Sequence, residues 1–307
     1  MKNIPLKKSL YVPVFTYRSD FLPFFFGFFP SINFKSSGNL RVKLMSPKIL
    51  VTNDDGVYST GLKAAYESVA DLGEVTISAP AMQQSGVGRS ISIFEPLRIT
   101  KTDIGGIPAH AVGGTPTDSV ILGIFTILKE MPDLILSGFN IGENISTDTI
   151  TTSGTIGGAL EAASYGIPAI AASMQVLEEG QKFDDPRDYH RERFEVAIKF
   201  VNRIARNVLK HGMPDSVDLL NINVPYHAEE DTPIEVTRLA RKVFKTDVEE
   251  RHDPRGRPYY WIAGDLIREE AEGTDVHALM QKGHVSITPI SLDSTAPIDF
   301  SEIEKYF

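Results

Sequence analysis

Short apolar runs alternate with amphipathic stretches along most of this chain, and this alternation limits the possible folds more than any other feature. The apolar runs that predict strands end in polar or glycine-containing turns: 49–52, 74–79, 134–136, 169–173 and 217–224. Between them, apolar residues at helical spacing predict four helices: 61–69, 115–128, 155–165 and 191–209. Strands alternating with helices predict an α/β protein with a doubly wound, mostly parallel, Rossmann-like sheet.

The pattern changes after Pro225. Two short β-prone runs, 234–237 and 259–262, lie on either side of a polar stretch at 249–257, and 285–288 predicts a last strand. This arrangement indicates a C-terminal extension rich in β-hairpins rather than another strand–helix unit.

The first 44 residues differ from the rest of the chain. They hold seven Lys or Arg residues and one acidic residue, whereas the whole chain carries a net charge of −9. Their apolar tract at 21–30 is shorter than the ~20 residues of a membrane-spanning helix, and proline and glycine interrupt it. Met45 directly precedes the first predicted strand. We therefore expect a disordered segment or one outside the native chain; the alternative is a membrane-surface or targeting role.

Three parts of the chain follow from these patterns: an N-terminal extension at 1–46, an α/β core at 47–225, and a hairpin extension with the C-terminal segment at 226–307. We expect the last part to serve oligomerisation.

Composition and missing motifs exclude several kinds of site. The chain has no cysteine, which excludes disulfides, a thiol nucleophile, a cysteine-based zinc site and an iron–sulfur centre. The acidic balance argues against binding to a nucleic-acid polymer. A P-loop, a His-Glu-x-x-His motif and a Gly-x-Ser-x-Gly motif are absent from the sequence, and its seven histidines are scattered. We expect a cytoplasmic protein with no membrane partner.

Polar residues gather where the first predicted strand ends, at Asn53, Asp54, Asp55 and Gly56. Two adjacent carboxylates repel each other, so both stay ionised most easily beside a cation. A hard divalent metal with oxygen ligands is the natural partner. A solvated Asp-Asp-Gly turn explains the same residues equally well.

Three further polar clusters follow later strands. The loop at 79–90 contains Gly86 and Gly88, but it lacks the dinucleotide-binding fingerprint and alone fits a flexible surface loop. Asn140 offers a neutral oxygen ligand, a hydrogen bond to phosphate, or simply a turn residue. The polar run 151–155 leads into a helix and forms an anion site or a plain N-cap. Because ligands bind beyond the carboxyl ends of parallel strands, the four clusters together indicate a metal–phosphate site.

Ordered blocks of sequence give the chain a resemblance to the SurE family of metal-dependent nucleotidases over roughly residues 47–290. The blocks are 48–56 (KILVTNDDG), 78–80 with 85–91, 114–120, 133–144 with Asp148 and 153–155, 253–257 with 259–261, and 272–275. Two positions depart from the family pattern: Ser146 replaces a usual Gly, and Thr152 replaces a common Tyr.

The resemblance implies a site with three overlapping groups of residues. One divalent ion per subunit, Mg²⁺ or Mn²⁺, would bind to Asp54, Asp55, Ser85 and Asn140. The two aspartates would be the catalytic residues. Substrate and phosphate would contact Asn53, Gly86, Asn140, Ser153, Gly154 and Thr155.

The implied activity is that of a 5′-nucleotidase, which removes phosphate from nucleoside 5′- or 3′-monophosphates by metal-assisted attack of water. The resemblance also implies a homodimer or homotetramer. Two alternatives are a non-catalytic nucleotide-binding regulatory module and a phosphatase that prefers short polyphosphate. A dinucleotide-dependent oxidoreductase is disfavoured, because the first strand leads into Asn53–Gly56 and not into a Gly-x-Gly-x-x-Gly turn.

Overall fold

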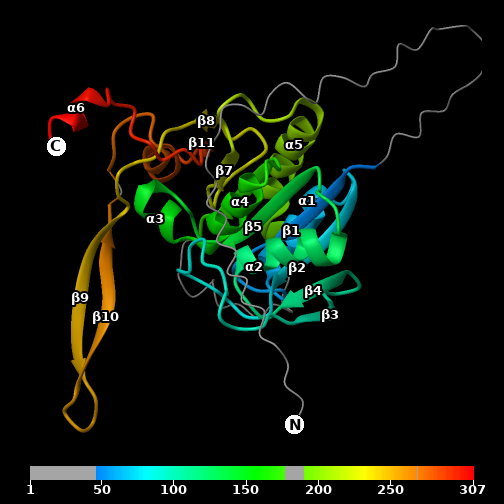
Figure 1. The fold of residues 1–307 in the computed structure, drawn as a ribbon, viewed down its shortest axis with the longest axis horizontal. Helices are drawn as coiled ribbons and strands as arrows, with labels where there is room; N and C mark the ends of the chain where they lie inside the picture. The colour runs from blue at the N-terminus through cyan, green and yellow to red at the C-terminus, as the bar shows by residue number, and fades with distance from the viewer. Residues whose placement is uncertain (1–45, 177–189, 268) are drawn as a thin grey trace, which may run out of the picture. The chain divides into compact units, whose positions relative to one another are not determined.

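The computed structural model describes residues 46–176, 190–267 and 269–307. The prediction for the N-terminal extension therefore falls, except for its last residue, outside the described part. Within that part, nine strands form one sheet in the order β3-β4-β2-β1-β5-β6-β7-β11-β8 (Figure 1). Their bounds are β1 Lys48–Thr52, β2 Glu74–Pro80, β3 Ile99–Asp103, β4 Pro108–Val112, β5 Leu134–Ile141, β6 Ala169–Met174, β7 Leu219–Val224, β8 Ile234–Val236 and β11 Val285–Ile290.

The predicted fold class is confirmed, because the six central strands from β4 to β7 all pair in parallel. Antiparallel pairs occur only towards the two ends of this sheet, between β3 and β4 and between β7 and β11. In the register of the sheet, Val51 of β1 lies between Ile77 of β2 and Leu136 of β5. After β1 the chain adds β2 on one side of that strand, and it later returns to add β5 on the other side. Ligands bind at such a reversal of strand order.

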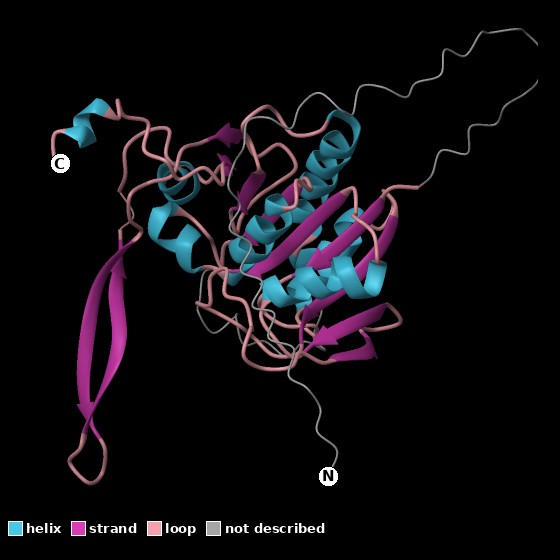
Figure 2. Cartoon of the chain, in the orientation of Figure 1, coloured by secondary structure: helices cyan, strands magenta, loops and turns pink. Residues whose placement is uncertain are grey.

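Helices pack on both faces of the sheet (Figure 2). One face carries α1 (Thr60–Val69) and α5 (Glu195–His211); the other carries α2 (Pro116–Leu122) and α4 (Gly154–Ser164). Ile49 and Val51 belong to the first core, and Leu50, between them, belongs to the second. This alternation is the expected result of a strand whose successive side chains point to opposite faces.

Some elements differ from the sequence-based expectation. The helix predicted at 115–128 is α-helical only as α2, and Gly123–Leu128 continues it as a π-helical segment, η1. A short helix, α3 (Ser146–Thr152), precedes α4 and was not predicted, nor were β3 and β4.

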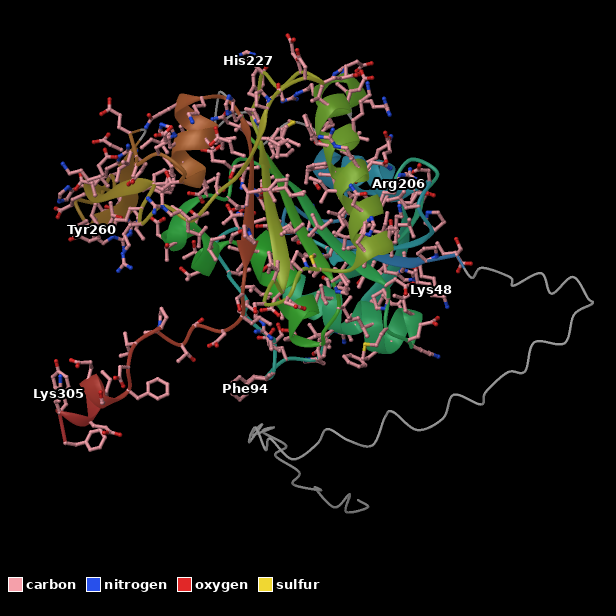
Figure 3. The ribbon with its side chains drawn as sticks, turned by 90° about the horizontal axis from the view of Figure 1, so that it is seen from above. Lys48, Phe94, Arg206, His227, Tyr260 and Lys305 are labelled. Atoms are coloured by element: carbon pink, nitrogen blue, oxygen red, sulfur yellow. The ribbon has the colours of Figure 1, made fainter. Side chains whose placement is uncertain are left out.

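The segment after β8 contains a second, two-stranded sheet, formed by β9 (Phe244–His252) and β10 (Pro258–Leu266). All residues of its two strands are exposed, among them Tyr260, whose position Figure 3 shows. Short helical segments complete the described chain: η3 Arg191–Arg193, η4 His277–Gln281 and α6 Ser301–Glu304. In the described residues, we find no helix with the length and apolar character needed to cross a membrane.

Candidate metal and phosphate site

Asp54 lies just beyond β1 and contacts two other segments of the chain. Its side chain is buried, and its Oδ1 accepts a hydrogen bond from the Thr155 hydroxyl at the start of α4. Its backbone carbonyl accepts a hydrogen bond of 2.7 Å from the backbone N–H of Gln84, in the loop after β2. Three of the predicted polar clusters therefore meet at this residue.

Burial raises the pKa of the Asp54 carboxyl above its ordinary value. Hydrogen bonds from the Thr155 hydroxyl and from the backbone N–H groups of Asp54, Thr155 and Gly154 act in the opposite direction. The carboxylate thus lies at the N-terminus of α4, where the helix favours negative charge. A cation beside it would further favour its ionised form.

Asp55 connects the same site to β5. Its Oδ2 accepts a hydrogen bond of 3.2 Å from the backbone N–H of Ile141. The preceding residue, Asn140, lies at an irregularity in the pairing of β5 with β6. The amide nitrogen of Asn140 donates to the carbonyl oxygen of Gly142 at 2.6 Å. This bond orients the amide and uses the nitrogen, which is the atom that a metal does not bind.

The loop after β2 is held against the start of α4. Gly88 donates its backbone N–H to the carbonyl of Thr152 at 2.8 Å. Ser85 is exposed, and its hydroxyl accepts a hydrogen bond of 3.1 Å from the side chain of Gln83. Gly86 is exposed too, with a φ of +75°, and a Cβ atom added to it would meet no other atom within 4 Å. Ser85 thus directly follows Gln84, the residue whose N–H contacts Asp54.

Ser153 and Gly154 shape the beginning of α4. Ser153 caps the helix, its Oγ accepting a hydrogen bond of 3.3 Å from the N–H of Ile156. A Cβ atom on Gly154 would lie 2.7 Å from the Cβ of Asp54 and 3.0 Å from the carbonyl oxygen of Gln84. Only glycine therefore lets the helix approach Asp54 this closely.

Asn53 shapes the turn after β1. It is buried, and its side-chain nitrogen donates to Ser59 Oγ at 2.6 Å, the same hydroxyl that caps α1. Its Oδ1 is also buried and has no hydrogen-bond partner among the described residues. The hydrogen bond to Ser59 thus gives Asn53 a role in positioning the turn.

The donor set fits a hard divalent cation. Two carboxylates, one hydroxyl and one amide oxygen are the ligand types that Mg²⁺ and Mn²⁺ accept. In the described part of the chain, no three His, Cys, Asp or Glu side chains gather as a metal-binding group. The proposed set has only two such residues, Asp54 and Asp55, and neutral oxygens complete it.

Sequence reasoning missed one ion pair beside the site. Arg89, in the loop after β2, donates from Nε to Glu161 Oε2 of α4 at 2.8 Å. Glu161 is only 3% exposed. Burial and a hydrogen bond to Glu161 raise the pKa of Tyr165 to about 12. The signal in the sequence was a single carboxylate in a helix of small apolar residues, which requires a buried partner.

Comparisons with known proteins identify the family of the chain. A family model described as "Survival protein SurE" matches residues 49–246. A protein of Methanosarcina acetivorans named "5'-nucleotidase SurE" is 90% identical over 264 residues, which cover 86% of this chain and 99% of that protein. A protein of the same name from Archaeoglobus fulgidus is 52% identical over 260 residues, covering 85% and 97%.

A solved structure is similar as well. The crystal structure of the SurE protein from Aquifex aeolicus has a TM-score of 0.70 and 38% sequence identity, covering 85% of this chain and 99% of that one. The family model spans more than half of the chain, and the relatives are matched over nearly their whole length. The chain therefore belongs to the SurE family.

Proposed function

We propose that this protein is a metal-dependent phosphomonoesterase that removes phosphate from nucleoside monophosphates, with the 5′-monophosphates as its main substrates. The contact between Asp54 and the first residues of α4 carries the proposal, because a carboxylate, which can bind a cation, lies beside a helix N-terminus, which can bind an anion. The activity named for the two archaeal relatives supports it.

In this proposal Asp54, Asp55, the Ser85 hydroxyl and the Asn140 amide oxygen hold one Mg²⁺ or Mn²⁺ ion. When bound, such an ion polarises a phosphoryl oxygen and lowers the pKa of a bound water. Thr155 donates a hydrogen bond from its hydroxyl to Asp54, so this hydroxyl orients the carboxylate instead of contacting phosphate. Ser153, Gly154 and Thr155 then offer the positive end of α4 to the phosphate. Asn53 supports the substrate site from below by positioning the turn that carries both aspartates, and Gly86 lies at its exposed side.

The proposal extends to assembly and location. Exposed apolar side chains on the β9–β10 hairpin support a homodimer or homotetramer that buries them against another subunit. We place the activity in the cytoplasm, where nucleoside monophosphates are metabolites.

The test is phosphate release from nucleoside 5′- and 3′-monophosphates and from tripolyphosphate, with Mg²⁺, with Mn²⁺ and with EDTA. We expect release that requires metal and that Asp54→Asn lowers by roughly 100-fold or more, since even outer-shell changes at metal sites cost 10–100-fold. Asp71→Asn is the control, because Asp71 is an exposed carboxylate paired with Arg206 on the surface. Folded wild-type protein that releases no phosphate from any nucleotide would contradict the proposal, and release from tripolyphosphate alone would favour the polyphosphatase alternative.

A further inference from the structure

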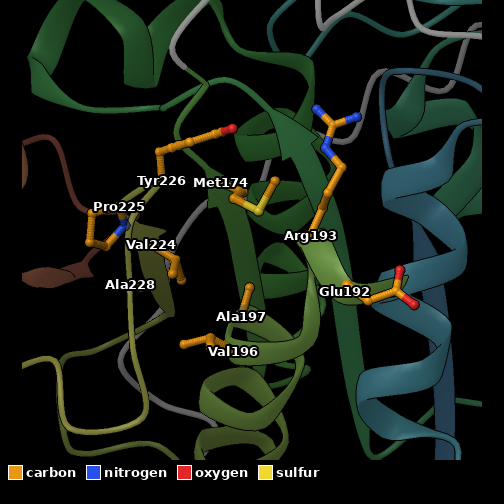
Figure 4. Close-up of a pocket in the computed structure, with 9 residues that line it drawn as sticks. All are labelled: Met174, Glu192, Arg193, Val196, Ala197, Val224, Pro225, Tyr226 and Ala228. Atoms are coloured by element: carbon orange, nitrogen blue, oxygen red, sulfur yellow. The ribbon is translucent and has the colours of Figure 1, made fainter. Parts of the chain in front are cut away.

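A hollow of about 190 Å³ lies at the carboxyl edge of the sheet, beside the ends of β6 and β7 (Figure 4). Its buried lining is apolar and comes from Met174, Val224 and Ala197. Tyr226, which is half-buried, and Arg193, which is exposed, flank Met174 in the view of Figure 4. The hollow therefore combines an apolar floor with an aromatic wall and a charged rim.

The sheet connects this hollow to the candidate metal site. Met174 pairs with Ile141 of β5, the residue whose N–H donates to Asp55. The carbonyl of Met174 also accepts a hydrogen bond of 2.8 Å from the N–H of Gly142. With strands about 4.8 Å apart, β6 lies roughly 10 Å and β7 roughly 14 Å from β1 along the sheet edge. A ligand whose phosphate lies at Asp54 and Asp55 can thus extend along this edge into the hollow.

Gln175, which follows Met174 in the sequence, holds Tyr226 in place. Gln175 accepts a hydrogen bond of 3.3 Å from the backbone N–H of Tyr226 through its Oε1. The N–H of Gln175 donates to the carbonyl of Val224 at 2.9 Å, and its side-chain nitrogen donates to the sulfur of Met280 at 3.1 Å. The positions of wall and floor are therefore coupled before a ligand arrives, which lowers the entropy lost on binding.

We infer that this hollow is the subsite for the base of the nucleoside monophosphate, an inference that rests on the proposed function. A nucleobase is a flat ring with a polar edge and two π-faces, and Tyr226 offers one of these faces a surface for stacking above the thioether of Met174. Stacking accepts every base, because each has a π-face. Recognition in this subsite therefore favours nucleotides over other phosphate esters without strong preference among bases.

The experiment compares AMP and UMP with ribose 5-phosphate, which has the same sugar and phosphate but no base. Tyr226→Ala should raise KM for both nucleotides by about 10-fold, the scale of one lost base–aromatic stack, with little change in kcat. Its KM for ribose 5-phosphate should stay unchanged. Tyr226→Phe, which keeps the ring, should behave like wild type, and Ala228→Trp, which fills the hollow, should behave like Tyr226→Ala. Arg203→Ala is the control, because Arg203 lies over Phe200 in a neighbouring hollow on α5.

Adenosine binding, measured by calorimetry on the same full-length variants, separates this inference from the proposed function. Wild type that binds adenosine more tightly than Tyr226→Ala supports the base subsite even if no nucleotide is hydrolysed. Equal adenosine binding by wild type, Tyr226→Ala and Ala228→Trp overturns the inference even if wild type is an active nucleotidase. An equal loss of activity on nucleotides and on ribose 5-phosphate in Tyr226→Ala also overturns it.

Discussion

Ser146 has a φ of +72°, in the left-handed region where a Cβ atom is strained. The family pattern usually has glycine at this position, and the backbone conformation gives the physical reason. Two interactions hold the serine there: its N–H donates to Asp275 Oδ2 at 2.7 Å, and its hydroxyl donates to Asp148. Asp275 is itself buried and also accepts from the N–H of Ala240 at 2.8 Å. The strain is thus maintained by a buried carboxylate that connects α3 to the C-terminal segment.

We predict that Ser146→Gly is more stable than Ser146→Ala by about 1 kcal/mol, because both lose the hydroxyl but only the alanine keeps the strained Cβ. Urea unfolding of the two variants measures the difference. The same pair of substitutions at Asn207, an exposed position within α5, should give the opposite order, since glycine weakens a helix interior. An alanine variant as stable as the glycine variant at position 146 would contradict the prediction.

At the scale of elements, the sequence predicted those strands and helices whose own side chains carry the periodic signal. Strands β1, β2, β5, β6 and β7 and helices α1, α4 and α5 are of this kind. β3 was missed because its Thr-Lys-Thr centre is mostly exposed, and its place depends on pairing with β4. The π-helical geometry of η1, the segment that continues α2, was missed because the spacing of its apolar residues suits either helix type.

The candidate site was predictable to the extent that strand order follows from a doubly wound fold. That rule placed the ends of β1, β2 and β5 at one edge, and the structure brings Asp54, Gln84 and Thr155 into contact there. The pairing of Arg89 with Glu161 joins residues 72 positions apart in the sequence, and no local pattern specifies it. Whether Asp54, Asp55, Ser85 and Asn140 together bind metal stays a proposal.

We predict that the ion pair between Arg89 and Glu161 sets metal affinity by fixing the loop after β2. The loop carries Ser85, and it touches α4 so closely that a Cβ on Gly157 would lie 2.2 Å from the carbonyl oxygen of Gly88. Glu161→Gln keeps the shape of the side chain and removes the charge that binds Arg89. We expect the Kd for Mn²⁺ to rise roughly 10-fold, as for other outer-shell changes at metal sites.

Calorimetric titration with Mn²⁺ in the absence of substrate measures this Kd directly. Glu67→Gln serves as the control, because Glu67 forms a comparable ion pair with Arg191 on the surface, away from the loop. An unchanged Kd for Mn²⁺ in Glu161→Gln would show that the loop holds its place without the ion pair.

At the scale of the whole molecule, the β9–β10 hairpin stands out because it exposes large apolar side chains. Among the described residues its strands pair only with each other, and Trp261 and Ile262 are 56% and 84% exposed. Neighbouring aromatic side chains, Tyr259 and Tyr260, are exposed as well. The subunit interface proposed above would account for apolar surface of this kind on a paired strand. Burial of the hairpin against another subunit removes this apolar surface from water, which favours association.

Trp261 is the single tryptophan of the chain, so its fluorescence reports on the hairpin alone. We predict that wild-type protein sediments as a dimer or tetramer and that its tryptophan emission is that of a buried indole. Ile262→Lys places a charge in the interface, where burial of an unpaired charge is costly, so it should shift the protein to monomer and move the emission to longer wavelength. Thr246→Lys adds the same charge to the exposed strand β9 of the hairpin without removing an apolar side chain, and it should leave both signals nearer to wild type. A wild-type protein that sediments as a monomer with solvent-exposed tryptophan emission would remove the hairpin from any role in assembly and leave its apolar side chains for a different kind of partner.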